Sequence, residues 1–156
     1  MADPTPNSTQ NQAPKDLIGM LDYYLVQKAP FQIPDAGREW IVKFGPWIAV
    51  VLLVISLPAL LLVLGLGTAF MPVGYATGFG ISAIFLIAML GLEVAALPGL
   101  FARKMTGWKL MFYAQLVGFL HTLVVSSYNI IGGLIGGLIG LTIGLYILFQ
   151  IRTKYN

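Results

Sequence analysis

The chain contains no cysteine and only one histidine, His121. Without cysteine there is no disulfide, no thiolate metal ligand and no cysteine nucleophile. With a single histidine, one chain cannot assemble a multi-histidine zinc site or a two-histidine haem site. No aspartate follows Asp35, so a Ser/His/Asp triad cannot form within the apolar part of the sequence, and no phosphate-binding glycine loop is present. We therefore expect no metal, no cofactor and no catalytic residue.

Charged residues are also scarce. They make up 10% of the chain and hydrophobic residues 58%, whereas a soluble domain carries roughly 25% charged residues. So few charges cannot cover a surface that faces water, and a lipid bilayer is the expected surrounding. The basic residues flank apolar segments and form no continuous stripe, so we expect no nucleic-acid partner.

The first 44 residues are the most polar part of the sequence. Residues 1–14 contain three prolines and little hydrophobicity, which predicts a disordered tail. Residues 15–44 are predicted to form amphipathic helices that lie in the membrane interface or pack on the ends of the spans. In residues 15–27 one helical face collects the apolar side chains Leu17, Ile18, Leu21, Tyr24 and Leu25. A second short helix over residues 36–44 is expected, with Asp35 as its N-cap.

Four apolar stretches follow, at about residues 46–66, 78–97, 107–125 and 130–149. Each is close to the roughly 20 residues that an α-helix needs to cross the hydrocarbon core. Pro58 predicts a kink in the first stretch. The expected fold is an all-α integral membrane protein, with a four-transmembrane-helix bundle over residues 45–150 and a short tail over residues 151–156.

The positions of the positive charges predict the orientation of the bundle. All nine lysines and arginines lie before the first apolar stretch, between the second and third or at the start of the third, or after the fourth: Lys15, Lys28, Arg38, Lys43, Arg103, Lys104, Lys109, Arg152 and Lys154. Positive residues accumulate in cytoplasmic loops. We therefore expect a multi-pass protein of the plasma or inner membrane, with both termini in the cytoplasm.

The fourth apolar stretch contains a glycine-zipper pattern. Glycines recur every fourth residue at Gly132, Gly136, Gly140 and Gly144, which places them on one helical face. Glycines on one face let another helix approach closely. The pattern predicts tight helix packing, either within the chain or in a homo-oligomer or larger membrane complex, and the sequence leaves both open.

Glu93 is the only acidic residue inside an apolar stretch. An ionised carboxylate near the middle of a bilayer costs roughly 3 kcal/mol on insertion scales. Glu93 must therefore be protonated, paired or directed into a cavity. It is either a proton or cation site, or a structural residue near the end of its span and within reach of Arg103.

Three other polar residues lie in the third stretch. Counting residues from the span centres puts His121 roughly 12 Å from Glu93 along the membrane normal, which is too far for a hydrogen bond. Tyr113 and Gln115 lie at nearly the depth of Glu93 and are better partners. His121 is either a buried histidine with a hydrogen-bond partner, an axial ligand for a pigment, or a lone protonatable group.

Two functions fit these features. The first is a structural, scaffold or accessory subunit of a membrane complex, which the absence of catalytic groups favours. The second is a small oligomeric proton- or cation-coupled transporter or channel that uses Glu93. The sequence identifies neither a substrate nor a partner.

Overall fold

The computed structural model describes residues 16–61, 73–125 and 130–156. Four long helices dominate this part of the chain: α2 (Asp35–Leu61), α3 (Val73–Phe101), α4 (Met105–Val125) and α5 (Ile130–Gln150). All four are long and apolar enough to cross a membrane, and the described residues contain no strand. The prediction of an all-α, four-span protein is confirmed.

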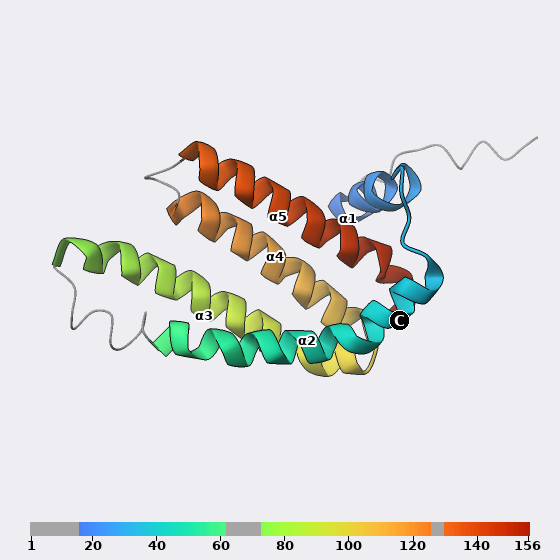
Figure 1. Ribbon diagram of the computed structural model, residues 1–156, viewed down its shortest axis with the longest axis horizontal. Coiled ribbons are helices and arrows are strands. Elements are labelled where there is room, and N and C mark those ends of the chain that lie inside the picture. The colour runs from blue at the N-terminus through green and yellow to red at the C-terminus, as the bar shows by residue number, and fades with distance from the viewer. Residues whose placement is uncertain (1–15, 62–72, 126–129) are drawn as a thin grey trace, which may run out of the picture.

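The long helices pack in the order in which they occur along the chain (Figure 1). The most extensive contact is between α3 and α4; α2 lies against α3, and α5 lies against α4. In Figure 1, α2 and α5 come together near the C-terminus and diverge toward their other ends. The long helices therefore lie closer together at the end that carries the C-terminus, where the buried core residues also gather. We call the closely packed end the basic end, because Arg103, Lys104, Arg152 and Lys154 lie there.

The turn between α3 and α4 depends on two glycines in contact. A Cβ atom added at Gly107 would lie 2.4 Å from the backbone nitrogen of Leu100, and one added at Gly99 would lie 2.6 Å from the Gly107 Cα atom. Only glycine permits this approach. Arg103 takes a positive φ of 52° in the turn. The tight turn holds α3 and α4 together at the basic end.

Helix α2 differs from the expectation of a short helix followed by a separate span. It runs without interruption from Asp35 to Leu61, with Pro46 and Pro58 inside it. A proline removes one backbone hydrogen bond, and membrane helices tolerate this when neighbouring groups satisfy the freed carbonyl. The expected helix over residues 36–44 is therefore the first part of the first span.

The N-terminal segment is helical and docks on α5. It consists of α1 (Leu17–Asp22) and the π-helix η2 (Tyr23–Gln27). The Asp16 side chain caps α1 by accepting a hydrogen bond of 3.1 Å from the Gly19 amide. Four apolar side chains of the segment pack against the core, namely Ile18, Leu21, Leu25 and Val26. The sequence left open whether this segment lies in the membrane interface or packs on the end of a span, and in the structure it packs on the end of α5. The predicted tail over residues 1–14 lies outside the described residues.

The core of the protein lies at the basic end. Trp108 and Phe112 of α4 stack on each other, and Phe149 of α5 meets both rings edge-on. Trp108 is fully buried, and its indole N–H donates a hydrogen bond of 2.7 Å to the Leu148 carbonyl oxygen. The last residues belong to this core and do not form a free tail: after the 3-10 helix η5 (Arg152–Lys154), Tyr155 is buried.

Candidate functional site

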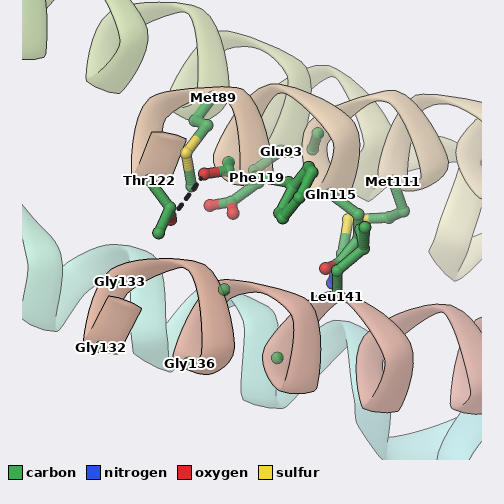
Figure 2. Close-up of a pocket in the computed structure, with 14 residues that line it drawn as sticks. Met89, Glu93, Met111, Gln115, Phe119, Thr122, Gly132, Gly133, Gly136 and Leu141 are labelled. Carbon is green, nitrogen blue, oxygen red and sulfur yellow. Dashed lines mark hydrogen bonds between the residues drawn. The ribbon is translucent and has the colours of Figure 1, made fainter. Parts of the chain in front are cut away.

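A cavity of about 490 Å³ lies between α3, α4 and α5 (Figure 2). Helix α3 contributes Met89 and Glu93, and α2 contributes no lining residue. The remaining lining residues come from α4 and α5: Met111, Ala114, Gln115, Gly118, Phe119, Thr122, Gly132, Gly133, Gly136, Gly137, Gly140 and Leu141. The cavity lies within the membrane-spanning part of the bundle, beyond the aromatic core.

The Glu93 carboxyl group points into this cavity (Figure 2). Helix α3 continues past the expected end near Leu97 to Phe101, so Glu93 lies eight residues from the helix end, or roughly 12 Å at 1.5 Å per residue. Arg103, which the sequence offered as a partner, is paired with Glu39. Within the described residues, the Glu93 carboxyl group has no hydrogen bond or ion pair.

Two further polar side chains line the same cavity. Gln115 shares it with Glu93, as the depth estimate suggested, yet no hydrogen bond joins their side chains in the described structure. Thr122 donates a hydrogen bond of 3.1 Å to the Gly118 carbonyl oxygen one turn earlier in α4. The Thr122 oxygen therefore keeps its acceptor capacity for a group in the cavity.

Tyr113 and His121 are placed away from the cavity. Tyr113 is exposed and lies edge-on to Phe112. His121 lies beside Phe85 of α3, with ring centroids 5.6 Å apart, and its buried Nε2 atom has no hydrogen-bond partner among the described residues. The structure thus brings together Glu93 and Gln115, and it separates both from Tyr113 and His121.

The α5 glycines divide into two groups. At Gly137 and Gly144 an added Cβ atom would come within 3.0 Å of a side chain of α4: 2.9 Å from Thr122 and 2.6 Å from Gln115, respectively. At Gly136 and Gly140 it would meet nothing within 4 Å. Gly132, Gly136 and Gly140 line the cavity. Helix contact within the chain therefore involves Gly144 and Gly137, while three glycines of the four-residue repeat border open space.

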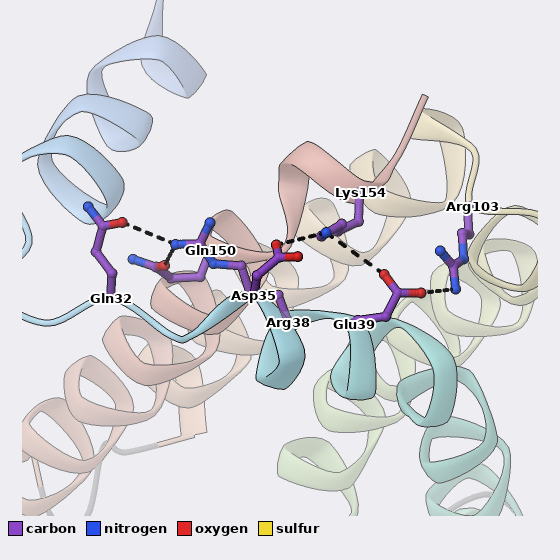
Figure 3. Close-up of polar contacts among 7 residues, drawn as sticks. All are labelled: Gln32, Asp35, Arg38, Glu39, Arg103, Gln150 and Lys154. Atoms are coloured by element: carbon purple, nitrogen blue, oxygen red, sulfur yellow. Dashed lines mark hydrogen bonds and ion pairs between the residues drawn. The ribbon is translucent and has the colours of Figure 1, made fainter.

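A polar group that the sequence did not single out lies at the basic end (Figure 3). Gln150 is 1% exposed. Its amide nitrogen donates a hydrogen bond of 3.1 Å to the Leu25 carbonyl oxygen, and its Oε1 atom accepts one of 2.8 Å from Arg38. Gln150 thus connects α5 to the N-terminal segment and to α2. The feature of the sequence that could have indicated Gln150 is its position as a single amide side chain at the end of the fourth apolar stretch.

Ion pairs surround this group. Lys154 lies 2.8 Å from Asp35 and 3.9 Å from Glu39, and Glu39 also pairs with Arg103. These pairs are partly exposed, and such pairs contribute about 0–1 kcal/mol each. Burial raises the pKa of the Tyr155 hydroxyl, and the nearby Arg103 lowers it by a smaller amount. The network fixes the C-terminal residues against α2 and the α3–α4 turn.

The described residues contain no cluster of three or more His, Cys, Asp or Glu side chains that could hold a metal ion. The four apolar helices and the intramembrane cavity define a small, all-helical, multi-pass membrane protein. No protein-family model, curated protein or solved structure matches the chain.

Proposed function

We propose that the protein is a small proton- or cation-coupled membrane transporter with Glu93 as its ion-binding residue. One observation carries the proposal: the Glu93 carboxyl group faces a cavity of about 490 Å³ and has no partner within the described residues. A carboxylic acid at this depth is costly when ionised. A purely structural role for Glu93 would require a hydrogen-bond partner, and neither Tyr113 nor Gln115 provides one in the described structure.

The proposal gives Glu93 two states. When a proton or another cation neutralises its carboxyl group, the cost of placing a charge in the membrane falls. When the cation leaves, the charged form must be stabilised by water entering the cavity. Gln115 and Thr122 supply polar atoms on the facing helix for this exchange. Helix α5, which lines the cavity together with α3 and α4, is the element whose movement would change access.

The test is flux in proteoliposomes. Glu93→Gln keeps the shape of the side chain but cannot ionise, so it should abolish proton or cation flux while folding remains normal. Glu39→Gln is the matched control, because Glu39 is the only other glutamate and lies outside the cavity. Flux that is absent from the unaltered protein, or unchanged in Glu93→Gln, would contradict the proposal.

The alternative is an accessory or scaffold subunit of a membrane complex. It is favoured by the position of α2, which packs mainly on α3, contributes nothing to the cavity and exposes Trp47, Leu52 and Ile55. A helix of another protein could cover this face. Purification in mild detergent separates the two: a stable complex with a different protein, without flux, supports the accessory role.

A further inference from the structure

The wall that α5 presents to the cavity is made largely of glycine. Glycine costs about 1 kcal/mol relative to alanine inside a helix, and close helix contact is the usual compensation. Gly136 and Gly140 have no such contact, since a Cβ atom at either would meet nothing within 4 Å. Their missing side chains instead leave space in front of Glu93. The glycines at these two positions therefore keep the cavity open, which is a function other than helix packing.

The size and lining of the space suit a small organic molecule. Small-molecule sites are typically about 300–1,000 Å³, mostly apolar, with a few polar groups, and this cavity measures about 490 Å³. Met89, Met111 and Phe119 provide adaptable apolar and aromatic surface. Polar atoms come from Glu93, Gln115 and Thr122.

The charge of the cavity restricts the ligand further. The lining contains one acidic residue and no basic residue. A lipid chain or another neutral apolar molecule would leave the Glu93 carboxyl group without a partner, which is unfavourable for a polar group surrounded by apolar atoms. A bare Mg²⁺ or Ca²⁺ ion requires about six or more oxygen ligands, a transition metal requires several His, Cys or carboxylate ligands, and the described residues contain no cluster of three or more such side chains. A single positive charge on an apolar body satisfies both the carboxyl group and the apolar lining.

We infer that the cavity binds a monovalent organic cation with an apolar body, with Glu93 as the counter-charge and the glycines of α5 providing room for the body. This inference rests on the proposed function and names the substrate class of the same site. It also explains why the glycine repeat continues over Gly136 and Gly140, where an added Cβ atom would meet nothing within 4 Å.

The experiment measures equilibrium binding to the purified full chain in lipid nanodiscs, with empty nanodiscs subtracted. The probes are tetraphenylphosphonium and tetraphenylborate, which have similar shapes and opposite charges. We expect saturable binding of tetraphenylphosphonium and none of tetraphenylborate. Glu93→Gln should weaken binding by about tenfold or more, which corresponds to roughly 1.4 kcal/mol.

Three leucine variants test the role of the glycines. Gly136→Leu and Gly140→Leu should each reduce binding about tenfold or more by filling the cavity, with no loss of thermal stability. Gly91→Leu is the matched control, because Gly91 is exposed on α3, an added Cβ atom there meets nothing within 4 Å, and the residue does not line the cavity. It should bind like the unaltered protein.

Several outcomes would overturn the inference: equal binding of the two probes, unchanged binding in both cavity-filling variants, or a co-purified lipid that the cation does not displace. The test is separable from that of the proposed function. Glu93-dependent flux without tetraphenylphosphonium binding would keep the transporter and overturn the organic-cation class. Saturable binding that depends on Glu93, without any flux, would support the inference and contradict transport.

Discussion

The side-chain amide of Gln115 lies against the backbone of Gly144, so closely that a Cβ atom at Gly144 would be 2.6 Å from the Gln115 Oε1 atom. This contact lies where the cavity gives way to the aromatic core around Trp108 and Phe112. On the core side, side chains fill the space between α4 and α5. On the other side, Gly136 and Gly140 leave the space open.

Alanine substitutions at three glycines should have graded effects on stability. Gly107→Ala should lower the free energy of unfolding by about 1–3 kcal/mol, because its Cβ atom would lie 2.4 Å from the backbone nitrogen of Leu100. Gly144→Ala should cost less, because the end of the Gln115 side chain can rotate away. Gly136→Ala should raise stability by up to about 1 kcal/mol, the difference in helix propensity.

Thermal unfolding of the three variants in the same detergent measures their order of stability. The sequence pattern alone predicts that Gly136 and Gly140 are packing residues whose enlargement is harmful. If Gly136→Ala proves less stable than Gly107→Ala, or if it disrupts an oligomer, Gly136 contacts another chain, and the account of an open cavity wall is wrong.

Trp108→Phe should destabilise the protein by about 1–3 kcal/mol, the usual cost of leaving a buried polar group unsatisfied. The substitution removes the indole N–H that donates to the Leu148 carbonyl oxygen at 2.7 Å and leaves that oxygen without its partner. Trp47→Phe is the matched control, because Trp47 is 62% exposed and packs on Phe101. Equal unfolding temperatures for the two variants would show that this hydrogen bond contributes nothing.

Leu21→Asp should release the N-terminal segment from the basic end. Leu21 packs against the core, whereas Leu17 on the same helix is 59% exposed. Burying a carboxylate without a partner is unfavourable, so amide hydrogen exchange over residues 17–27 should accelerate in Leu21→Asp and stay near the original rate in Leu17→Asp. Fast exchange in the unaltered protein would contradict the docked position.

We expect the basic end to face the cytoplasm. Tags at either terminus should be accessible from the cytoplasm only, and a tag after Thr68 from the opposite side only, because positive residues accumulate in cytoplasmic loops. Protease protection, or labelling of a single cysteine introduced at each of these positions, measures this in intact cells. A C-terminus found outside the cell would exclude this orientation.

The four helices could be predicted from the sequence because hydropathy and length are local properties. The continuity of α2 was missed, since Pro46 normally argues for a boundary and only the surrounding packing shows that the helix continues. The N-terminal helix and its apolar face could also be predicted, but the sequence left open whether the helix lies in the membrane interface or packs on the ends of the spans, and it did not indicate α5. That choice depends on contacts such as Gln150 to Leu25, which are 125 residues apart.

The site was predictable as a set of residues and unpredictable as an arrangement. Glu93 and Gln115 were singled out by polarity and depth, and the structure places both on one cavity. Tyr113 has a similar depth but faces away from the cavity. The sequence could not show this, because a depth estimate does not give the direction of a side chain around the helix axis. The glycine repeat predicts one smooth face of α5, and only the position of α4 determines that Gly144 is in contact while Gly140 is not.

The docking of the N-terminal segment on α5 has a consequence for biosynthesis. Asp22 pairs with Arg152, which follows it by 130 residues, so at about 5–20 residues per second the segment exists for roughly 7–26 seconds before its docking surface is made. During that time the apolar face that contains Leu21 has no protein surface to cover it. Release of this segment therefore distinguishes a molecule whose last helix is not yet in place from a finished one.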